Sequence, residues 1–100
     1  MDQANPVNDA LDEITEELFR AVEKFPTWPT DPLHAAVIVG EEFGELQQAI
    51  LQRIYEPDKG TTIDDARKEA LQLAAMSLRF LLSFGEYRFD AGEQHEQQLR

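Results

Sequence analysis

The sequence predicts an all-α protein, and three observations lead to this prediction. Apolar residues recur at spacings of three and four along three separate stretches, which is the period of an amphipathic helix. Segments rich in proline or glycine separate the stretches, and a helix-capping residue precedes each of them. No stretch shows the alternation of a strand. We expect residues 1–100 to form a single domain, with a flexible N-terminus (1–8), a helical core (9–84) and a polar C-terminal tail (86–100).

The first predicted helix covers about 9–24. Asn8 is its expected N-cap, and the acidic residues that follow suit the positive end of the helix dipole. Its apolar side chains recur at helical spacing: Leu11, Ile14, Leu18, Phe19, Val22 and Phe25. The helix is expected to stop before Pro26, because proline disfavours the helical conformation of the residue before it.

A connector with three prolines, residues 26–32 (PTWPTDP), leads into the second predicted helix at about 32–55. Asp31 is its expected N-cap, with Pro32 at the first helical position. Gly40 and Gly44 weaken this helix by about 1 kcal/mol each relative to alanine. Their spacing of four indicates a place where another backbone packs closely.

The third predicted helix covers about 63–84. Thr62 and Asp65 form a capping-box-like start, and Gly85 is the expected C′ residue. Apolar residues lie on nearly every side of this helix, which indicates burial on more than one face. One chain of three helices can hardly cover that surface, so we expect a dimer or a larger bundle. The tail from Ala91 is a further candidate for helix.

Composition excludes several function classes. The chain has 9 Lys+Arg and 20 Asp+Glu, a formal net charge of −11, so we expect neither nucleic acid nor a membrane surface as a partner. The absence of cysteine excludes disulfides, thiolate zinc sites and cysteine nucleophiles. The longest apolar run has only five residues (35–39), and the N-terminus lacks a signal-peptide pattern. We therefore expect a cytoplasmic protein.

Several carboxylates occupy positions where solvated residues are not expected. On a helix with 3.6 residues per turn, Glu42 and Glu45 share a stripe with small and apolar residues. Glu69 and Gln72 lie on a partly apolar stripe of the third helix. Buried carboxylates are unfavourable unless they are paired or bind a metal, and oxygen ligands from two helices suit Mg²⁺ or Mn²⁺. The alternative is that Glu42 and Glu45 are solvated, or pair with Arg53, Arg67 or Lys68.

The same residues carry a resemblance to a known family. Residues 41–45 read EEFGE, an EExxE motif, and after 23 intervening residues 69–72 (EALQ) stand where the family has ExxD. Upstream, 28–29 (WP) and 33–36 (LHAA) lead into the motif. Over about 25–84 the chain therefore resembles the MazG-like family of the all-α nucleoside triphosphate pyrophosphatase superfamily. Gln72 departs from the family pattern, which has aspartate there.

The resemblance implies a four-helix-bundle core built by oligomerisation, as a dimer or a tetramer. It implies Mg²⁺-dependent hydrolysis of a nucleoside triphosphate, (d)NTP, to (d)NMP and pyrophosphate, in the house-cleaning of nucleotide pools. It assigns Glu42, Glu45 and Glu69, with Gln72 at the fourth position, to the metal. It assigns Glu41 or Glu45 to the activation of the attacking water.

The neutral amide of Gln72 leaves other functions open. The site lacks one negative charge, so Mg²⁺ should bind more weakly, unless Asp65 compensates through an outer-shell water. A nucleotide-binding protein without turnover and a degenerate relative are two alternatives. A helical oligomer or a partner-binding adaptor without nucleotide chemistry is a third.

Four residues are candidates for substrate binding. Trp28 could stack on a nucleobase, and His34 could approach the base or a phosphate. Lys68 and Arg79 lie about 80–100° from Glu69 around the third helix and could contact phosphates. Each has a structural alternative: Trp28 could plug the end of the bundle, His34 could pack or be solvated, and the two cations could pair with surface acids.

Overall fold

The computed structural model describes residues 5–90 and contains no strand within this range. Its helices are α1 (Pro6–Lys24), α2 (Pro32–Tyr55) and α3 (Ile63–Leu82), with short 3₁₀ helices η1 (Pro57–Lys59) and η2 (Phe84–Glu86). The prediction of an all-α fold with three main helices is confirmed. The predictions for 1–4 and for the tail from Ala91 lie outside the described residues.

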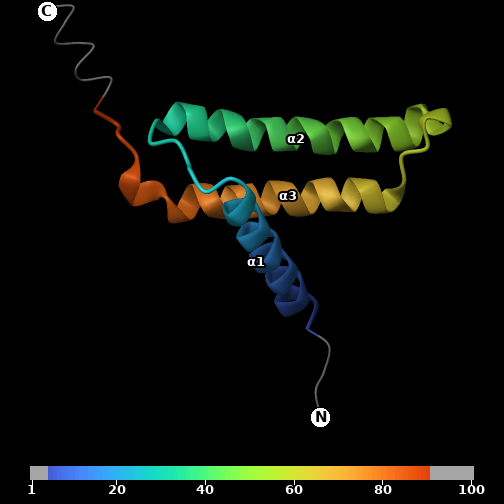
Figure 1. Cartoon of the computed structure of the whole chain (residues 1–100). Coiled ribbons are helices and arrows are strands. Elements are labelled where there is room, and N and C mark those ends of the chain that lie inside the picture. The colour runs from blue at the N-terminus through green and yellow to red at the C-terminus, as the bar shows by residue number, and fades with distance from the viewer. Residues whose placement is uncertain (1–4, 91–100) are drawn as a thin grey trace, which may run out of the picture.

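α3 is the central helix of the fold. α2 and α3 run antiparallel and side by side, and α1 crosses α3 at an angle (Figure 1). α3 packs against both other helices, whereas no Cα atoms of α1 and α2 approach within 8 Å of one another. The burial of α3 on more than one face follows from this arrangement. α1 and α2 therefore form two separate walls on the same central helix.

The core is small. Leu18 of α1 packs against Ala75 and Met76 of α3, and all three are buried. Partly buried apolar side chains surround them: Ile14, Ala21, Trp28, Val39 and Leu78. Because the core joins α1 to α3 next to the connector, it fixes where the C-terminal end of α1 lies.

The start of α1 differs from the prediction. The helix begins at Pro6, because the side-chain oxygen of Asn5 accepts hydrogen bonds from the backbone N–H groups of Val7 (3.1 Å) and Asn8 (3.2 Å). Pro6 takes the first helical position, where a missing N–H is no loss. Asn8 is therefore inside the helix rather than its N-cap, and the helix includes residues 6–8, which the prediction assigned to the segment before it.

The starts of α2 and α3 agree with the prediction. Asp31 caps α2 by accepting a hydrogen bond from the Leu33 N–H (2.9 Å), with Pro32 at the first position. Thr62 and Asp65 form a complete capping box at α3. The Thr62 hydroxyl accepts from the Asp65 N–H (3.0 Å), and the Asp65 carboxylate accepts from the Thr62 N–H (2.8 Å).

The end of α3 differs from the prediction. The helix ends at Leu82, and Gly85 lies inside η2 rather than at C′. The chain turns here because four aromatic rings pack together, with centroids 4.9–6.2 Å apart: Phe80, Phe84, Tyr87 and Phe89. The Arg88 N–H then donates to the Thr30 carbonyl (2.9 Å). The segment after α3 is thereby attached to the connector before α2.

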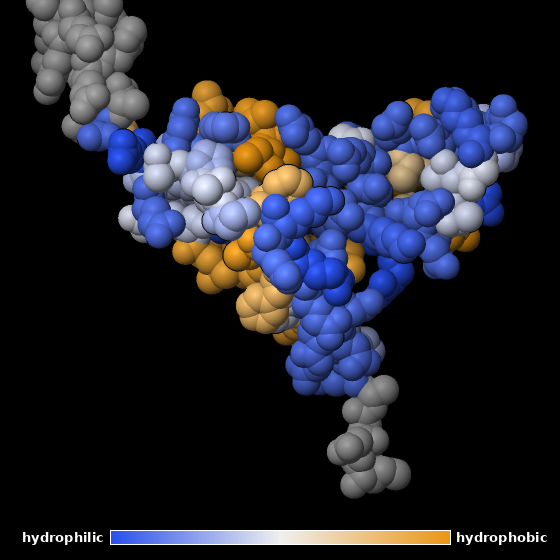
Figure 2. Space-filling model, viewed as in Figure 1, coloured by the Kyte–Doolittle hydropathy of each residue, from blue (hydrophilic) through white to orange (hydrophobic). Residues whose placement is uncertain are grey.

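Large apolar side chains remain at the surface of the single chain (Figure 2). More than half of each of the following is exposed: Phe19, Phe25, Leu33, Ile54, Ile63 and Leu82. Gly40 and Gly44 have no close neighbour, since an added Cβ would meet nothing within 4 Å. The expected close backbone approach is therefore absent from the described part of this chain. None of its described helices combines the length and apolarity that crossing a membrane requires.

Candidate metal centre

Three glutamates from two helices meet between α2 and α3. Glu42 and Glu45 are one turn apart on α2, and Glu69 comes from α3. One carboxylate oxygen of each lies within 4.8 Å of the others. Glu42 and Glu69 are partly buried and Glu45 is exposed. Carboxylate oxygens from several side chains are the usual protein ligands of a hard divalent cation.

The negative charge of this acidic cluster is uncompensated. Glu42 Oε2 and Glu69 Oε2 are buried without a hydrogen-bond partner in residues 5–90, and no lysine or arginine in that range forms an ion pair with them. Burial, followed by repulsion from Glu45 and Glu69, raises the pKa of Glu42. Burial, followed by the charge of Glu45, raises the pKa of Glu69. Buried carboxylates are unfavourable without a partner, so the donor set fits a bound cation.

No lysine or arginine of the described chain pairs with the cluster. Arg67 forms an ion pair with Glu13 of α1 (2.6 Å), and neither Arg53 nor Lys68 forms an ion pair within residues 5–90. The alternative in which basic side chains neutralise Glu42 therefore has no counterpart in the described structure. Asp65 is committed to the capping box, whose backbone hydrogen bond from Thr62 is the main cause of its lowered pKa. Its capping role accounts for its position without an outer-shell water.

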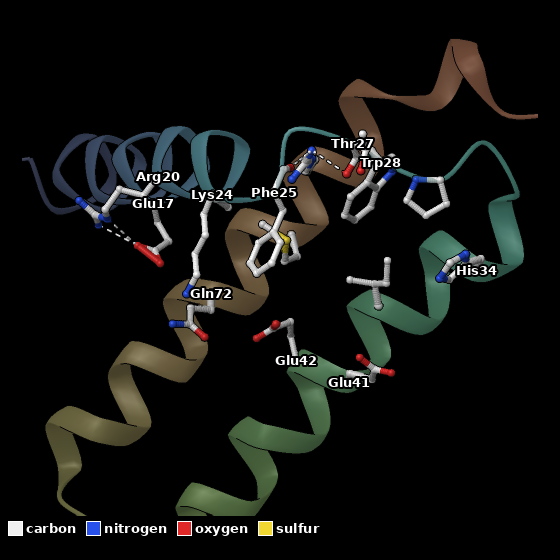
Figure 3. A pocket seen from close by; sticks show the side chains of 15 residues that line it. Glu17, Arg20, Lys24, Phe25, Thr27, Trp28, His34, Glu41, Glu42 and Gln72 are labelled. Atoms are coloured by element: carbon white, nitrogen blue, oxygen red, sulfur yellow. Dashed lines mark hydrogen bonds and ion pairs between the residues drawn. The ribbon is translucent and has the colours of Figure 1, made fainter.

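A pocket of about 730 Å³ lies beside the cluster, between α1, the connector, α2 and α3 (Figure 3). Glu42 lines it and so joins the cluster to the pocket. The other predicted site residues that line it are Trp28, His34, Glu41, Gln72 and Arg79. Lys68 does not line it. Because one residue along a helix is a rotation of about 100°, Lys68 points away from the direction taken by Glu69.

Trp28 and Arg79 form one end of the pocket. The Arg79 guanidinium lies 4.8 Å from the centroid of the Trp28 ring, and its Nη2 donates to the carbonyls of Phe25 (2.8 Å) and Thr27 (3.4 Å). Trp28 Nε1 donates to the Tyr87 hydroxyl (2.8 Å), which donates to the Phe80 carbonyl (3.0 Å). These bonds hold the connector against α3.

Arg79 is a buried cation without a matching acid. It is only 6% exposed, no carboxylate in residues 5–90 forms an ion pair with it, and burial lowers its pKa. A buried charge without a counter-ion is unfavourable. The pocket thus joins an acidic cluster that lacks a cation to an arginine that lacks an anion.

Sequence reasoning missed the α1 side of the pocket and the role of Tyr87. Arg20, Lys24 and Phe25 line the pocket from α1 and its C-cap. Their contribution depends on how α1 crosses α3, which no local motif encodes. Tyr87 lies beyond the predicted helices, and only its aromatic neighbours in the sequence could have drawn attention to it.

In comparisons with known proteins, the chain matches no protein-family model, no curated protein and no solved structure. The likeness to the MazG-like family therefore rests on the motif residues alone.

Proposed function

We propose that this protein is a divalent-cation-dependent nucleoside triphosphate pyrophosphohydrolase that converts (d)NTP and water to (d)NMP and pyrophosphate. The main support is a pocket lined by both Glu42 and Arg79. Glu42 belongs to a cluster in which it and Glu69 each bury an unpartnered carboxylate oxygen, and Arg79 is a buried cation without an ion pair in residues 5–90. The carboxylates favour a cation and the arginine favours an anion. A metal-bound polyphosphate satisfies both.

The metal-binding residues in this proposal are Glu42, Glu45 and Glu69, with Gln72 beside them. Mg²⁺, when bound, would neutralise phosphate charge and polarise the α-phosphoryl group. The protein has a net charge of −11, so a triphosphate needs such a mediator to approach the carboxylates. Gln72 offers a neutral oxygen, so we expect weaker Mg²⁺ binding than an aspartate would give.

Glu41 is the proposed general base. It lines the pocket next to Glu42 without belonging to the acidic cluster, so its carboxylate is available to a water molecule. Deprotonation of that water by Glu41 prepares it for attack at the α-phosphorus. In-line attack forms the new P–O bond as the bond to the bridging oxygen breaks and pyrophosphate leaves. Glu45 is the second candidate for this role.

The connector end of the pocket suits the nucleoside. One face of the Trp28 ring is occupied by Arg79, and its N–H is already donated to Tyr87. Trp28 would therefore contact a base by stacking through its other face, which requires no hydrogen bond and tolerates different bases. His34 lines the same pocket and is the polar candidate for contact with the base or a phosphate.

We also propose that the protein works as a homo-oligomer, a dimer or a tetramer with a four-helix core. The small core and the exposed apolar side chains support this proposal. A surface of this kind is typical of a chain that buries apolar area against a partner.

A second candidate function is nucleotide binding without turnover. The observation that favours it is Gln72, because a metal site that lacks one charged ligand could bind a nucleotide without hydrolysing it. Both functions predict binding, and only the first predicts pyrophosphate.

Pyrophosphate release from a panel of NTPs and dNTPs, with Mg²⁺ and with Mn²⁺, tests the proposal. We expect release from at least one nucleotide, a loss of at least 100-fold in the variants E42Q and E41Q, and no change in K59M, which alters a remote charge. Release that survives E42Q would overturn the assignment of the site. Binding without release would favour the second candidate.

A further inference from the structure

We infer that Lys24 binds the polyphosphate chain of the substrate from the α1 side of the pocket, opposite the carboxylates. This inference rests on the proposed function, because it assumes a polyphosphate ligand. It adds a substrate-binding residue on a helix that lies outside the motif region of the sequence.

The position of Lys24 follows from the packing of α1. Lys24 is the last residue of that helix, and the buried Leu18 anchors the helix on α3. Its side chain extends from α1 into the pocket, toward the side on which Gln72 and Glu42 lie (Figure 3). Since no Cα atoms of α1 and α2 approach within 8 Å of one another, Lys24 and Glu42 line the pocket from two different walls.

Three cationic side chains line this pocket, and they differ in the ion pairs and hydrogen bonds that they form. Arg20 forms an ion pair with Glu17 (2.8 Å) on the same helix. Arg79 donates to carbonyl groups of the connector. The Lys24 side chain forms no ion pair or hydrogen bond within residues 5–90, and its ammonium group lies 5.4 Å from the centroid of the Phe25 ring. Its ammonium group is therefore the pocket cation with all donors available to a ligand.

The neutral side chain of Gln72 favours the binding of an anion by Lys24. It lines the same pocket as Lys24, and an aspartate there would add a carboxylate that competes with phosphate for the ammonium group. With a neutral amide at this position, the metal has one charged ligand fewer, and Lys24 has no carboxylate partner there. We therefore expect the metal to bind more weakly and Lys24 to contribute directly to the binding of the polyphosphate.

The test combines direct binding with steady-state kinetics. Calorimetry at saturating Mg²⁺ follows the binding of inorganic tripolyphosphate to wild type, K24M, K24R and the remote charge control K59M. We expect K24M to weaken binding about tenfold, K24R to stay within about threefold and K59M to match wild type. With the best nucleotide of the panel, K24M should raise KM by a similar factor while kcat changes less than about threefold.

Each outcome decides the inference separately from the proposed function. If wild type releases pyrophosphate and K24M has an unchanged KM and unchanged tripolyphosphate affinity, the inference is wrong and the proposed function stands. If no nucleotide is hydrolysed but tripolyphosphate binding still depends on Lys24, the inference stands and the hydrolysis proposal fails. If wild type binds no tripolyphosphate, the inference is wrong whatever the kinetics show. A purely structural lysine at the end of α1 would lower the melting temperature in K24M without changing KM.

Discussion

Glu42 on α2 and Glu69 on α3 each bury a carboxylate oxygen that has no hydrogen-bond partner in the described chain, and the two carboxylates offer oxygens within 4.8 Å of each other. Two like charges held this way oppose folding unless something neutralises them. The fold keeps them together because α2 and α3 pack side by side along their length. The consequences of this relationship can be measured with and without metal.

Replacing Glu42 with glutamine should stabilise the metal-free protein. The amide keeps the shape and removes one of the opposed charges, so we expect a gain of about 1 kcal/mol, or roughly 4–8 °C in melting temperature for a domain of this size. Thermal denaturation in EDTA measures it. In wild type, but not in E42Q, added Mg²⁺ should raise the melting temperature. A loss of stability in E42Q without metal would contradict the account of the cluster.

The pH dependence of the stability that Glu42 and Glu69 contribute should reverse when metal is added. The pKa values of Glu42 and Glu69 are raised above 4.5, so the folded state favours their protonated forms. Without metal, their contribution to stability is fully present below about pH 4.5 and is lost as the pH rises through the folded pKa values. Metal binding needs the deprotonated carboxylates, so stabilisation by Mg²⁺ should grow over the same rise in pH.

Melting temperatures from about pH 4 to about pH 8, in EDTA and in Mg²⁺, check this reversal. Glu13 and Asp65 have lowered pKa values and act in the opposite sense, so the difference between wild type and E42Q isolates the cluster. If the melting temperatures of wild type and E42Q depended on pH in the same way in EDTA, the predicted effect of Glu42 ionisation on stability would be wrong.

Removing Arg79 should loosen the connector. The variant R79M leaves the carbonyls of Phe25 and Thr27 without their donor and removes the cation from the Trp28 ring. We expect a loss of roughly 2–3 kcal/mol in the free energy of unfolding, measured by urea denaturation, with a shift in the fluorescence of the sole tryptophan. R67M, which breaks an exposed ion pair with Glu13, should lose much less. Equal losses of unfolding free energy in the two variants would contradict the claim that Arg79 holds the connector against α3.

A charge placed in the exposed apolar patch should dissociate the oligomer. Ile50, Ile54 and Ile63 line one shallow groove between the end of α2 and the start of α3, and Ile54 is 61% exposed. We expect wild type to sediment at a multiple of 11.4 kDa and I54D to move toward 11.4 kDa. Q48D adds the same charge at an exposed polar position of α2 and should sediment like wild type. A wild-type mass of 11.4 kDa at micromolar concentration would show that the chain does not need a partner.

The sequence was most informative where local chemistry determines structure. The capping box of Thr62 and Asp65 and the cap at Asp31 were predicted because both depend on residues within one turn. The start of α1 was wrong because Asn5 and Asn8 both fit an N-cap, and only Pro6 at the first position favours Asn5. The helical stripe that joins Glu42 to Glu45 was predicted from spacing alone.

The features of the site that the sequence did not predict depend on contacts between residues far apart in the chain. Trp28 and Tyr87 are hydrogen-bonded across 59 residues, and nothing in either neighbourhood indicates the other. Lys24 lines the pocket only because α1 crosses α3 where it does. Lys68 lies outside this pocket, because its side chain leaves the helix about 100° away from that of Glu69.

Calorimetric titration of the purified protein with Mn²⁺ tests whether Glu42, Glu45 and Glu69 bind a divalent cation. We expect saturable binding that is abolished in E42Q, weakened in E69Q and unchanged in K59M. We also expect tighter binding in Q72D, because an aspartate restores a charged ligand. Absence of Mn²⁺ binding to wild type, or binding that E42Q leaves unchanged, would contradict the claim that these glutamates form a metal centre.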